Sequence, residues 1–172
     1  MTPPPFDPYR ILEVLHRHNV RFIVVGALAA VIQGYPLPTQ DLDITPTRDR
    51  ENLERLVSAL RELDARLRVP RGDGIPFPLD RQMLETATGW TLETDSGPLG
   101  LVFLPAGTAG YDDLRSDAIE QTIRGLPQLL ASLRDVIRMK EAAGREKDLM
   151  ALPALRRTLE IVRERQRRGE ED

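Results

Sequence analysis

Two aspartates, Asp41 and Asp43, are the residues whose type and spacing best fit a chemical role. They lie in the run Asp-Leu-Asp-Ile-Thr, which alternates acidic and apolar residues as a half-buried strand does. Because side chains alternate faces along a strand, both carboxylates should project from one side, while Leu42 and Ile44 face a core. Two neighbouring carboxylates repel each other, and a bound hard cation relieves the repulsion. The spacing therefore predicts a Mg²⁺ site with Asp41 and Asp43 as ligands.

A glycine precedes this pair at a turn from strand to helix. The β-branched run 21–25 predicts a buried strand, Gly26 ends it before a short helix over 27–33, and the prolines of 34–40 predict a loop. Glycine allows close approach of a phosphate to the backbone, and a helix N-terminus favours the phosphate charge. This order of elements predicts a site for a nucleoside triphosphate (NTP) with Mg²⁺, in which a hydroxyl attacks the α-phosphate.

Composition narrows the possible chemistry. The chain has 172 residues with 41% apolar and 30% charged residues, no Cys and two His, which indicates one folded domain, with or without a helical appendage. Thiolate metal sites, disulfides and Cys nucleophiles are excluded, and His16 and His18 diverge on a predicted helix. No apolar run is long enough to span a bilayer, and the N-terminus lacks a basic n-region. We expect a cytoplasmic protein with no membrane contact and a metal held by carboxylates.

Periodicity and capping residues predict the elements that position the aspartates. Asp7 and Pro8 begin a helix over 8–19, and an amphipathic helix follows Asp49 over 50–63. Ser132 begins a helix that ends at Gly144, before a helical, Arg-rich stretch over 146–168. Two hairpins and two loops lie between these helices: strands over 90–94 and 99–103, strands over 118–123 and 126–130, and loops over 68–81 and 105–113.

The net charge of −3 averages two regions of opposite sign. Residues 134–168 contain 11 Lys or Arg and 6 Asp or Glu, a local charge of +5, whereas residues 1–133 carry −5. Lys and Arg bind phosphates of nucleic acids and nucleotides. The sequence therefore predicts an acidic half that suits a divalent cation beside a cationic helical end that suits a phosphate-bearing partner.

Two blocks of the chain resemble a known family. The segment 26–44 resembles the signature of the DNA polymerase β-like nucleotidyltransferase superfamily, a small-residue turn followed by an Asp-x-Asp strand. Together with 132–152, the segment 35–44 is similar to small prokaryotic nucleotidyltransferases related to the AbiEii and MenT toxins. The resemblance implies an α/β (α+β) fold, a mixed sheet flanked by helices over 1–131, with a C-terminal helical extension over 132–172 packed on that core.

The resemblance also implies an activity. Members of the family transfer a nucleoside monophosphate from an NTP to an acceptor hydroxyl with Mg²⁺, and the toxin members use RNA, in particular transfer RNA, or a protein hydroxyl. A toxin of this kind implies a cognate antitoxin as a protein partner. Two alternatives stay open: a relative that binds nucleotide or RNA without transfer, and an antibiotic-modifying nucleotidyltransferase.

Site residues follow from the matched motifs. The resemblance places Gly26 and Ala27 in the phosphate turn, Thr39 before the acidic strand, and Asp41 and Asp43 as the catalytic metal pair. In the C-terminal block it implies three cations that bind triphosphate or nucleic acid, Lys140, Arg145 and Lys147, and an acid that orients them, Asp148. The alternative interpretation of this block is a solvated helical face.

The chain departs from the family pattern in two places. Ala27 stands where relatives have Gly or Ser, which removes a hydroxyl but keeps the backbone N–H. Relatives often carry a third carboxylate in a later strand, where this chain has Leu-Gly-Leu centred on Gly100. Glu93 or Asp95 would replace that carboxylate if the hairpin brings one of them to the metal face, whereas Asp112 and Asp113 lie in a predicted loop.

Overall fold

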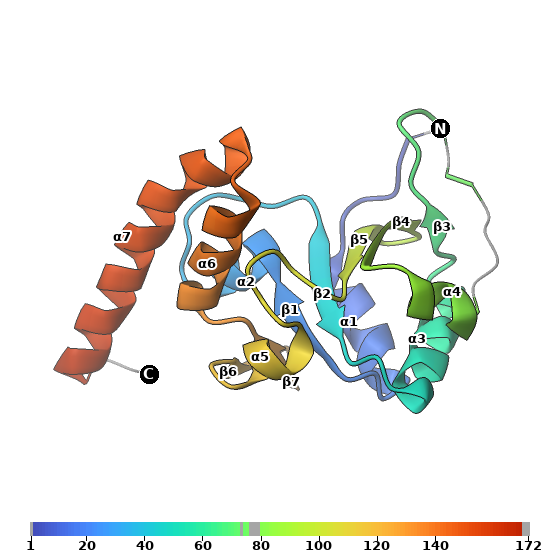
Figure 1. Cartoon of the computed structure of the whole chain (residues 1–172), viewed down its shortest axis with the longest axis horizontal. Coiled ribbons are helices and arrows are strands. Elements are labelled where there is room, and N and C mark those ends of the chain that lie inside the picture. The colour runs from blue at the N-terminus through green and yellow to red at the C-terminus, as the bar shows by residue number, and fades with distance from the viewer. Residues whose placement is uncertain (1, 73, 76–79, 170–172) are drawn as a thin grey trace.

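A seven-stranded mixed sheet organises the molecule (Figure 1). The computed structural model describes residues 2–72, 74–75 and 80–169. The strand order is β3-β4-β5-β2-β1-β7-β6, with bounds β1 Phe22–Val25, β2 Leu42–Pro46, β3 Arg66–Leu67, β4 Gly89–Thr94, β5 Gly97–Val102, β6 Ile119–Ile123 and β7 Leu126–Leu130. The mixed sheet confirms the predicted fold class.

Seven helices accompany the sheet in the described part of the chain: α1 Pro8–Arg17, α2 Gly26–Ile32, α3 Arg50–Glu62, α4 Arg81–Thr86, α5 Tyr111–Arg115, α6 Leu133–Ala143 and α7 Glu146–Arg168. Figure 1 shows α6 and α7 side by side at one end of the molecule and α3 with α4 at the other, with the sheet between them. None of these helices is long and apolar enough to cross a bilayer.

Burial explains the central strands. All four residues of β1 are buried, and β2 pairs with β1 antiparallel, with Val25 opposite Asp43. On its other side β2 pairs with β5 in parallel, with Asp43 opposite Gly100. The run that precedes Gly26 and the acidic run, both predicted as strands, are therefore adjacent strands in the middle of the sheet.

Capping residues fix where the helices begin. The side chain of Asp7 accepts a hydrogen bond from Arg10 N at 3.1 Å, and Pro8 opens α1. Ser132 Oγ accepts from Asp135 N at 3.1 Å at the start of α6, and Gly144 ends that helix in the left-handed region. The helix starts predicted at Asp7 and Ser132 and the helix end predicted at Gly144 are therefore confirmed. Such caps satisfy backbone groups that a helix end leaves unpaired.

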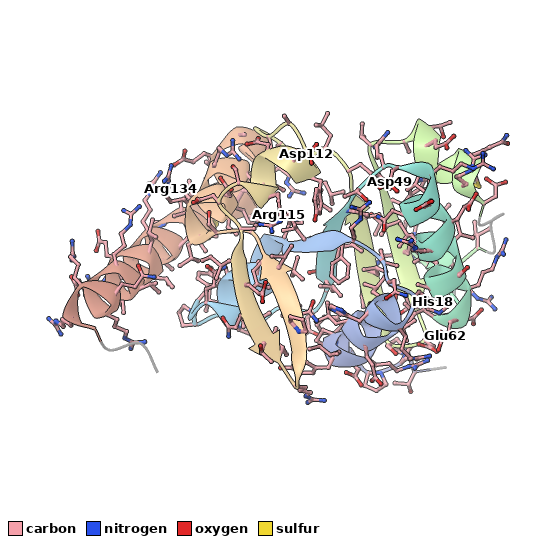
Figure 2. All side chains as sticks on the ribbon, turned by 90° about the horizontal axis from the view of Figure 1, so that it is seen from below. His18, Asp49, Glu62, Asp112, Arg115 and Arg134 are labelled. Atoms are coloured by element: carbon pink, nitrogen blue, oxygen red, sulfur yellow. The ribbon has the colours of Figure 1, made fainter. Side chains whose placement is uncertain are left out.

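His18 links the end of α1 to the end of α3. Nε2 of His18, just after α1, lies 2.5 Å from Oε2 of Glu62 at the end of α3, and Figure 2 shows the two side chains next to each other. Arg17 also reaches Glu62, at 2.7 Å. His18 is thus engaged in an interhelical contact.

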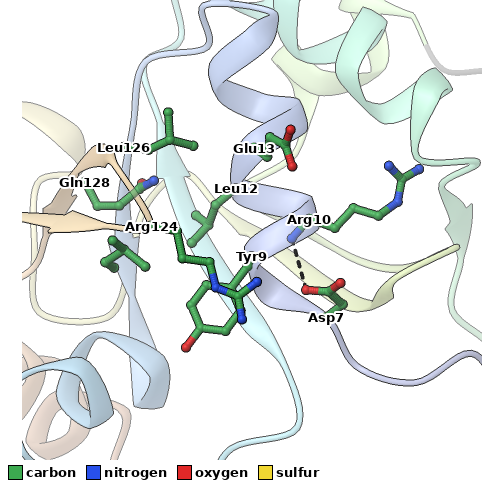
Figure 3. Close-up of a pocket in the computed structure, with 9 residues that line it drawn as sticks. Asp7, Tyr9, Arg10, Leu12, Glu13, Arg124, Leu126 and Gln128 are labelled. Atoms are coloured by element: carbon green, nitrogen blue, oxygen red, sulfur yellow. Dashed lines mark hydrogen bonds between the residues drawn. The ribbon is translucent and has the colours of Figure 1, made fainter.

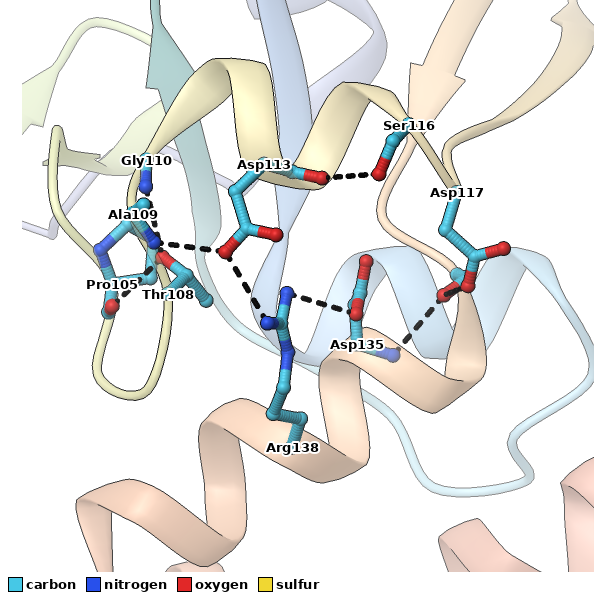
Figure 4. Close-up of polar contacts among 10 residues, drawn as sticks. Pro105, Thr108, Ala109, Gly110, Asp113, Ser116, Asp117, Asp135 and Arg138 are labelled. Atoms are coloured by element: carbon cyan, nitrogen blue, oxygen red, sulfur yellow. Dashed lines mark hydrogen bonds and ion pairs between the residues drawn. The ribbon is translucent and has the colours of Figure 1, made fainter.

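A polar cluster ties α6 to the segment around α5 (Figure 4). Arg138 of α6 contacts Asp113 at 3.2 Å and Asp135 at 3.0 Å. Ser132 Oγ donates to Asp117 at 2.8 Å while it caps α6. These contacts hold the N-terminal half of α6 against the chain that leads into the β6–β7 hairpin.

Several boundaries differ from the sequence prediction. Asp41 lies just before β2 rather than inside it, and Thr39 contacts it there. The segment 105–113 is not loop throughout, because α5 begins at Tyr111. The segment 68–81 follows the short strand β3 and ends where Asp80 caps α4; of this segment, Asp73 and residues 76–79 lie outside the described residues. Two-residue strands and one-turn helices are too short to give a periodic signal.

Ser132→Ala is expected to lower the free energy of unfolding by about 1–2 kcal/mol. The change removes the N-cap of α6 and the hydrogen bond to Asp117 together. Urea unfolding followed by circular dichroism measures it. Ser58→Ala is the matched control, since the exposed Ser58 Oγ bonds only Glu54 O within α3, and a loss of similar size there would contradict a specific role for Ser132.

Candidate functional site

Asp43 occupies the middle of the sheet. It lies between Val25 of β1 and Gly100 of β5 in the strand register. Asp41 lies two residues earlier in the chain, and its charge raises the pKa of Asp43. The two carboxylates therefore interact electrostatically, whereas their placement on one face of a strand stays a prediction, since Asp41 lies just before β2.

Two glycines make room for the Asp43 carboxylate. Gly26 has φ +70°, and a Cβ atom built on it would lie 2.8 Å from Oδ2 of Asp43. A Cβ on Gly100 would lie 2.1 Å from Oδ1. A side chain at either position would force the carboxylate to move. Gly26 thus begins α2 and also leaves one side of the Asp43 carboxylate uncovered.

Thr39 holds the other carboxylate. Its hydroxyl donates to Oδ1 of Asp41 at 3.1 Å and also lies 3.2 Å from the Asp41 carbonyl oxygen. The loop that precedes β2 therefore fixes Asp41 through a neighbouring side chain. Ala27 follows Gly26 in the first turn of α2 and is half-buried.

The half-buried Asp43 has a pKa well above the ordinary value for an aspartate. Burial, and then the charge of Asp41, raise the pKa of Asp43 to about 6 from an ordinary value of 3.8. Lys140, Lys147 and Arg145 act in the opposite direction. An ionised Asp43 is thus costly in the metal-free protein and is partly compensated by cations from α6 and α7.

A buried acid organises those cations. Asp148 of α7 is fully buried; its carboxylate accepts from Lys140 Nζ at 3.1 Å and from Arg145 Nε at 2.7 Å. Although burial disfavours the charge, the hydrogen bonds from Arg145 and Lys140 lower the pKa of Asp148. The predicted orienting role of Asp148 matches these contacts, and Lys147, next to it, is exposed.

The acid and the cations meet at one pocket. It has a volume of about 170 Å³ and includes Gly26, Asp43, Lys140, Arg145 and Asp148 in its lining. Its apolar walls come from the end of β5, the segment after it and one side of α6: Val102, Pro105, Ala106, Val136, Met139 and Ala143. The sequence analysis missed these walls, since only the fold brings the 105–106 segment to α6.

Among the described residues, the acids considered as a third carboxylate make their contacts away from Asp43. Glu93 is opposite Pro98 in the β4–β5 pair and contacts Arg68 at 3.1 Å. Asp95, in the turn of that hairpin, contacts Arg10 at 2.8 Å. Asp113 binds Ala109 N and Arg138. The expectation that Glu93 or Asp95 takes that place finds no support, because both carboxylates are engaged with arginines elsewhere.

The comparisons with known proteins rest on structure. No protein-family model and no curated protein sequence matches the chain significantly. Its structure is similar to that of the lincosamide antibiotic adenylyltransferase LnuA bound to lincomycin, with a TM-score of 0.59 and 12% identity over 87% of this chain and 94% of that one.

Two further structures are similar. One is ANT(2″)-Ia in complex with adenylyl-2″-tobramycin, with a TM-score of 0.55 and 16% identity over 95% of this chain and 97% of that one. The other is a Thermotoga maritima protein provisionally described as a nucleotidyltransferase, with a TM-score of 0.53 and 18% identity over 87% and 94%. The chain therefore has the fold of these nucleotidyltransferases.

Asp43→Asn is expected to stabilise the metal-free protein at neutral pH by about 1–3 kcal/mol. The pKa of Asp43 in the folded state, about 6, lies above the ordinary value of 3.8. Folding therefore favours the protonated carboxyl, and the penalty for its ionisation grows as the pH rises from about 4 to about 6 and then stays constant. Unfolding in the presence of a chelator, from pH 4 to pH 8, measures the difference.

Asp112→Asn is the matched control, since Asp112 is an exposed carboxyl in the first turn of α5. It should change stability by less than about 0.5 kcal/mol at every pH. If the parent and the Asp43→Asn variant have the same free energy of unfolding at pH 8, the charge of Asp43 is not costly and the prediction is contradicted.

Proposed function

We propose that this protein is a divalent-metal-dependent nucleotidyltransferase that moves a nucleoside monophosphate from an NTP to an acceptor hydroxyl. The observation that carries the proposal is the arrangement of charges: Asp43, with Asp41 beside it, faces Lys140 and Arg145 across one pocket. A carboxylate pair suits the metal of a metal–nucleotide complex, and cations opposite it suit the triphosphate. The fold shared with nucleotidyltransferases supports the same activity.

The donor set fits Mg²⁺ that arrives with a nucleotide. Within the described residues, no group of three or more His, Asp or Glu side chains is arranged to hold a metal. Two carboxylates leave coordination positions for phosphate oxygens and water, which is how Mg²⁺ is commonly bound with nucleotides. When bound, the ion supplies charge stabilisation to the transferred phosphoryl group.

The chain's own residues account for the other requirements. Asp43 must be ionised to bind a cation, so metal binding should weaken below about pH 6. Thr39 holds Asp41, and Asp148 holds Lys140 and Arg145, so that one carboxylate and two cations of the site are fixed in position. Gly26 leaves its side of the Asp43 carboxylate clear.

Position 100 is a glycine, so the chain has no carboxylate there to take the proton from the acceptor hydroxyl. General-base help is typically worth about 10² to 10⁴ in rate. Positioning and electrostatic stabilisation do not need that group. The proposed transfer is therefore slower than in relatives that carry an acid at this position.

For the acceptor we propose RNA, with transfer RNA as the first candidate and an antitoxin protein as a partner. The resemblance to AbiEii and MenT toxins supports this choice, as does the charge of +5 over residues 134–168. Four exposed arginines at the far end of α7 contribute to that charge: Arg163, Arg165, Arg167 and Arg168.

An antibiotic hydroxyl is the second candidate. The similar structures include LnuA bound to lincomycin and ANT(2″)-Ia bound to an adenylylated tobramycin. The same proposed metal and nucleotide sites would serve either acceptor, so only a transfer assay separates them.

Mg²⁺-dependent NTP binding tests the carboxylate pair. In calorimetry, Asp41→Asn and Asp43→Asn should each weaken binding at least about 10-fold, an effect typical even of residues that only orient a metal ligand. Asp112→Asn should bind as the parent does. Equal binding by the parent and both site variants would contradict the proposed metal site.

Transfer with labelled NTPs tests the acceptor. The protein is incubated with Mg²⁺ and, in parallel, with total transfer RNA, lincomycin or tobramycin. We expect label in transfer RNA, with loss of the label in Asp43→Asn. Label only in an antibiotic would favour the second candidate, and no label beside intact Mg²⁺-dependent NTP binding would indicate a nucleotide-binding protein without transfer.

A further inference from the structure

A second pocket lies on the face of the sheet opposite the Asp43 site, between α1 and the β6–β7 hairpin (Figure 3). The strand register places it there: Leu130 of β7 is beside Val24, whereas Asp43 is opposite the next residue, Val25. Gln128, two residues before Leu130, therefore points away from the Asp43 face. The pocket has a volume of about 350 Å³.

A buried amide lines this pocket. Gln128 is 1% exposed, and its Oε1 atom has no hydrogen-bond partner among the described residues. The pocket residues around it include the apolar side chains Leu12, Ile123 and Leu126, which offer no donor. A buried polar atom without a partner is costly, and such atoms in folded proteins call for an explanation. A ligand that pairs with the amide would satisfy it.

A flat cationic group lies at the same pocket. The guanidinium carbon of Arg124 is 3.8 Å from the centre of the Tyr9 ring, and both residues are exposed. Arg124 and Gly125 form the β6–β7 turn with φ values of 49° and 81°. Figure 3 shows the guanidinium over the Tyr9 ring. Arg guanidinium planes are common stacking partners of bases.

The charges around the pocket are nearly balanced. Arg10 contacts Asp95 at 2.8 Å, and Asp7 caps α1 through Arg10 N. The other charged lining residues are Glu13 and Arg124, of opposite sign. A site without net charge selects neither an anion such as phosphate nor a polycation, and it favours a neutral ligand group.

We propose that this pocket binds a nucleobase, with a donor–acceptor edge paired to the Gln128 amide and the ring stacked on Arg124. A Gln amide presents a donor and an acceptor in one plane, which matches the edge of a base. The volume lies at the lower end of the range for small-molecule sites, as a single base requires. The base comes from a free nucleotide or from an RNA strand. This site goes beyond the proposed transfer reaction, because it lies on the other face of the sheet.

The test is titration with the four ribonucleosides by ¹⁵N NMR, in chelator so that the metal-dependent site is silent. At least one nucleoside should shift the side-chain amide of Gln128 and the backbone signals of 9–13 and 123–128. Gln128→Met, which keeps the volume and removes the amide, should weaken binding about 10-fold or more, as loss of a bidentate base contact does. Asp43→Asn should bind as the parent does, so failure here is separate from failure of the transferase proposal.

Arg124→Asn is the second variant, because Asn suits the left-handed turn conformation and removes the stacking plane. It should weaken binding several-fold while the protein stays folded, which keeps the test decisive even if Gln128→Met unfolds. Short single-stranded oligoribonucleotides separate the sources: tighter binding than the nucleoside indicates RNA, and equal binding indicates a free nucleotide. Absence of any shift, shifts only around Gly26, unchanged binding in both variants, or binding of acetamide but no nucleoside would overturn the proposal.

Discussion

The carboxylate of Asp43 stands between Gly26 and Gly100 in the centre of the sheet, with the charge of Asp41 close to it. Burial and that second charge raise its pKa to about 6, and cations on two helices offset part of the cost. The site depends on this one constraint. Positions 26 and 100 must be glycine, because a side chain there would collide with the carboxylate. In addition, β2 must lie between β1 and β5 in this register, and α6 must bring Lys140 to the pocket.

The buried charge of Asp148 positions the cations that partly offset the charge of Asp43. Asp148 is fully buried and binds Lys140 of α6 and Arg145 at the start of α7, so it joins the two helices and holds the cations in place. A buried acid that loses its partners is strongly destabilising. The turn between α6 and α7 is therefore both a structural joint and one wall of the pocket, and the polar cluster around Arg138 anchors the other end of α6.

Local sequence signals predicted what depends on neighbours in the chain. The buried run of β1, the caps at Asp7 and Ser132, and the Asp pair are all recognisable from a few adjacent residues. The position of Gly100 beside Asp43 is different, because it depends on the pairing of β2 with β5.

Other features were beyond a single sequence for the same reason. Glu93 and Asp95 looked available until the fold brought Arg68 and Arg10 to them. Gln128 lies in a predicted hairpin strand, and its burial beside a pocket that α1 also lines depends on the fold. Short elements such as β3 and α5 carried no periodic signal.

The central claim is that Asp41 and Asp43 hold a divalent cation together with a nucleotide. The most direct measurement is a crystal structure with Mn²⁺ and a non-hydrolysable NTP analogue, in which anomalous scattering locates the metal. The account predicts an anomalous peak bonded to carboxylate oxygens of both aspartates and to phosphate oxygens, with the phosphates directed toward Lys140 and Arg145. A peak at other carboxylates, such as those of Asp113 and Asp135, or nucleotide bound without metal at Asp43, would contradict it.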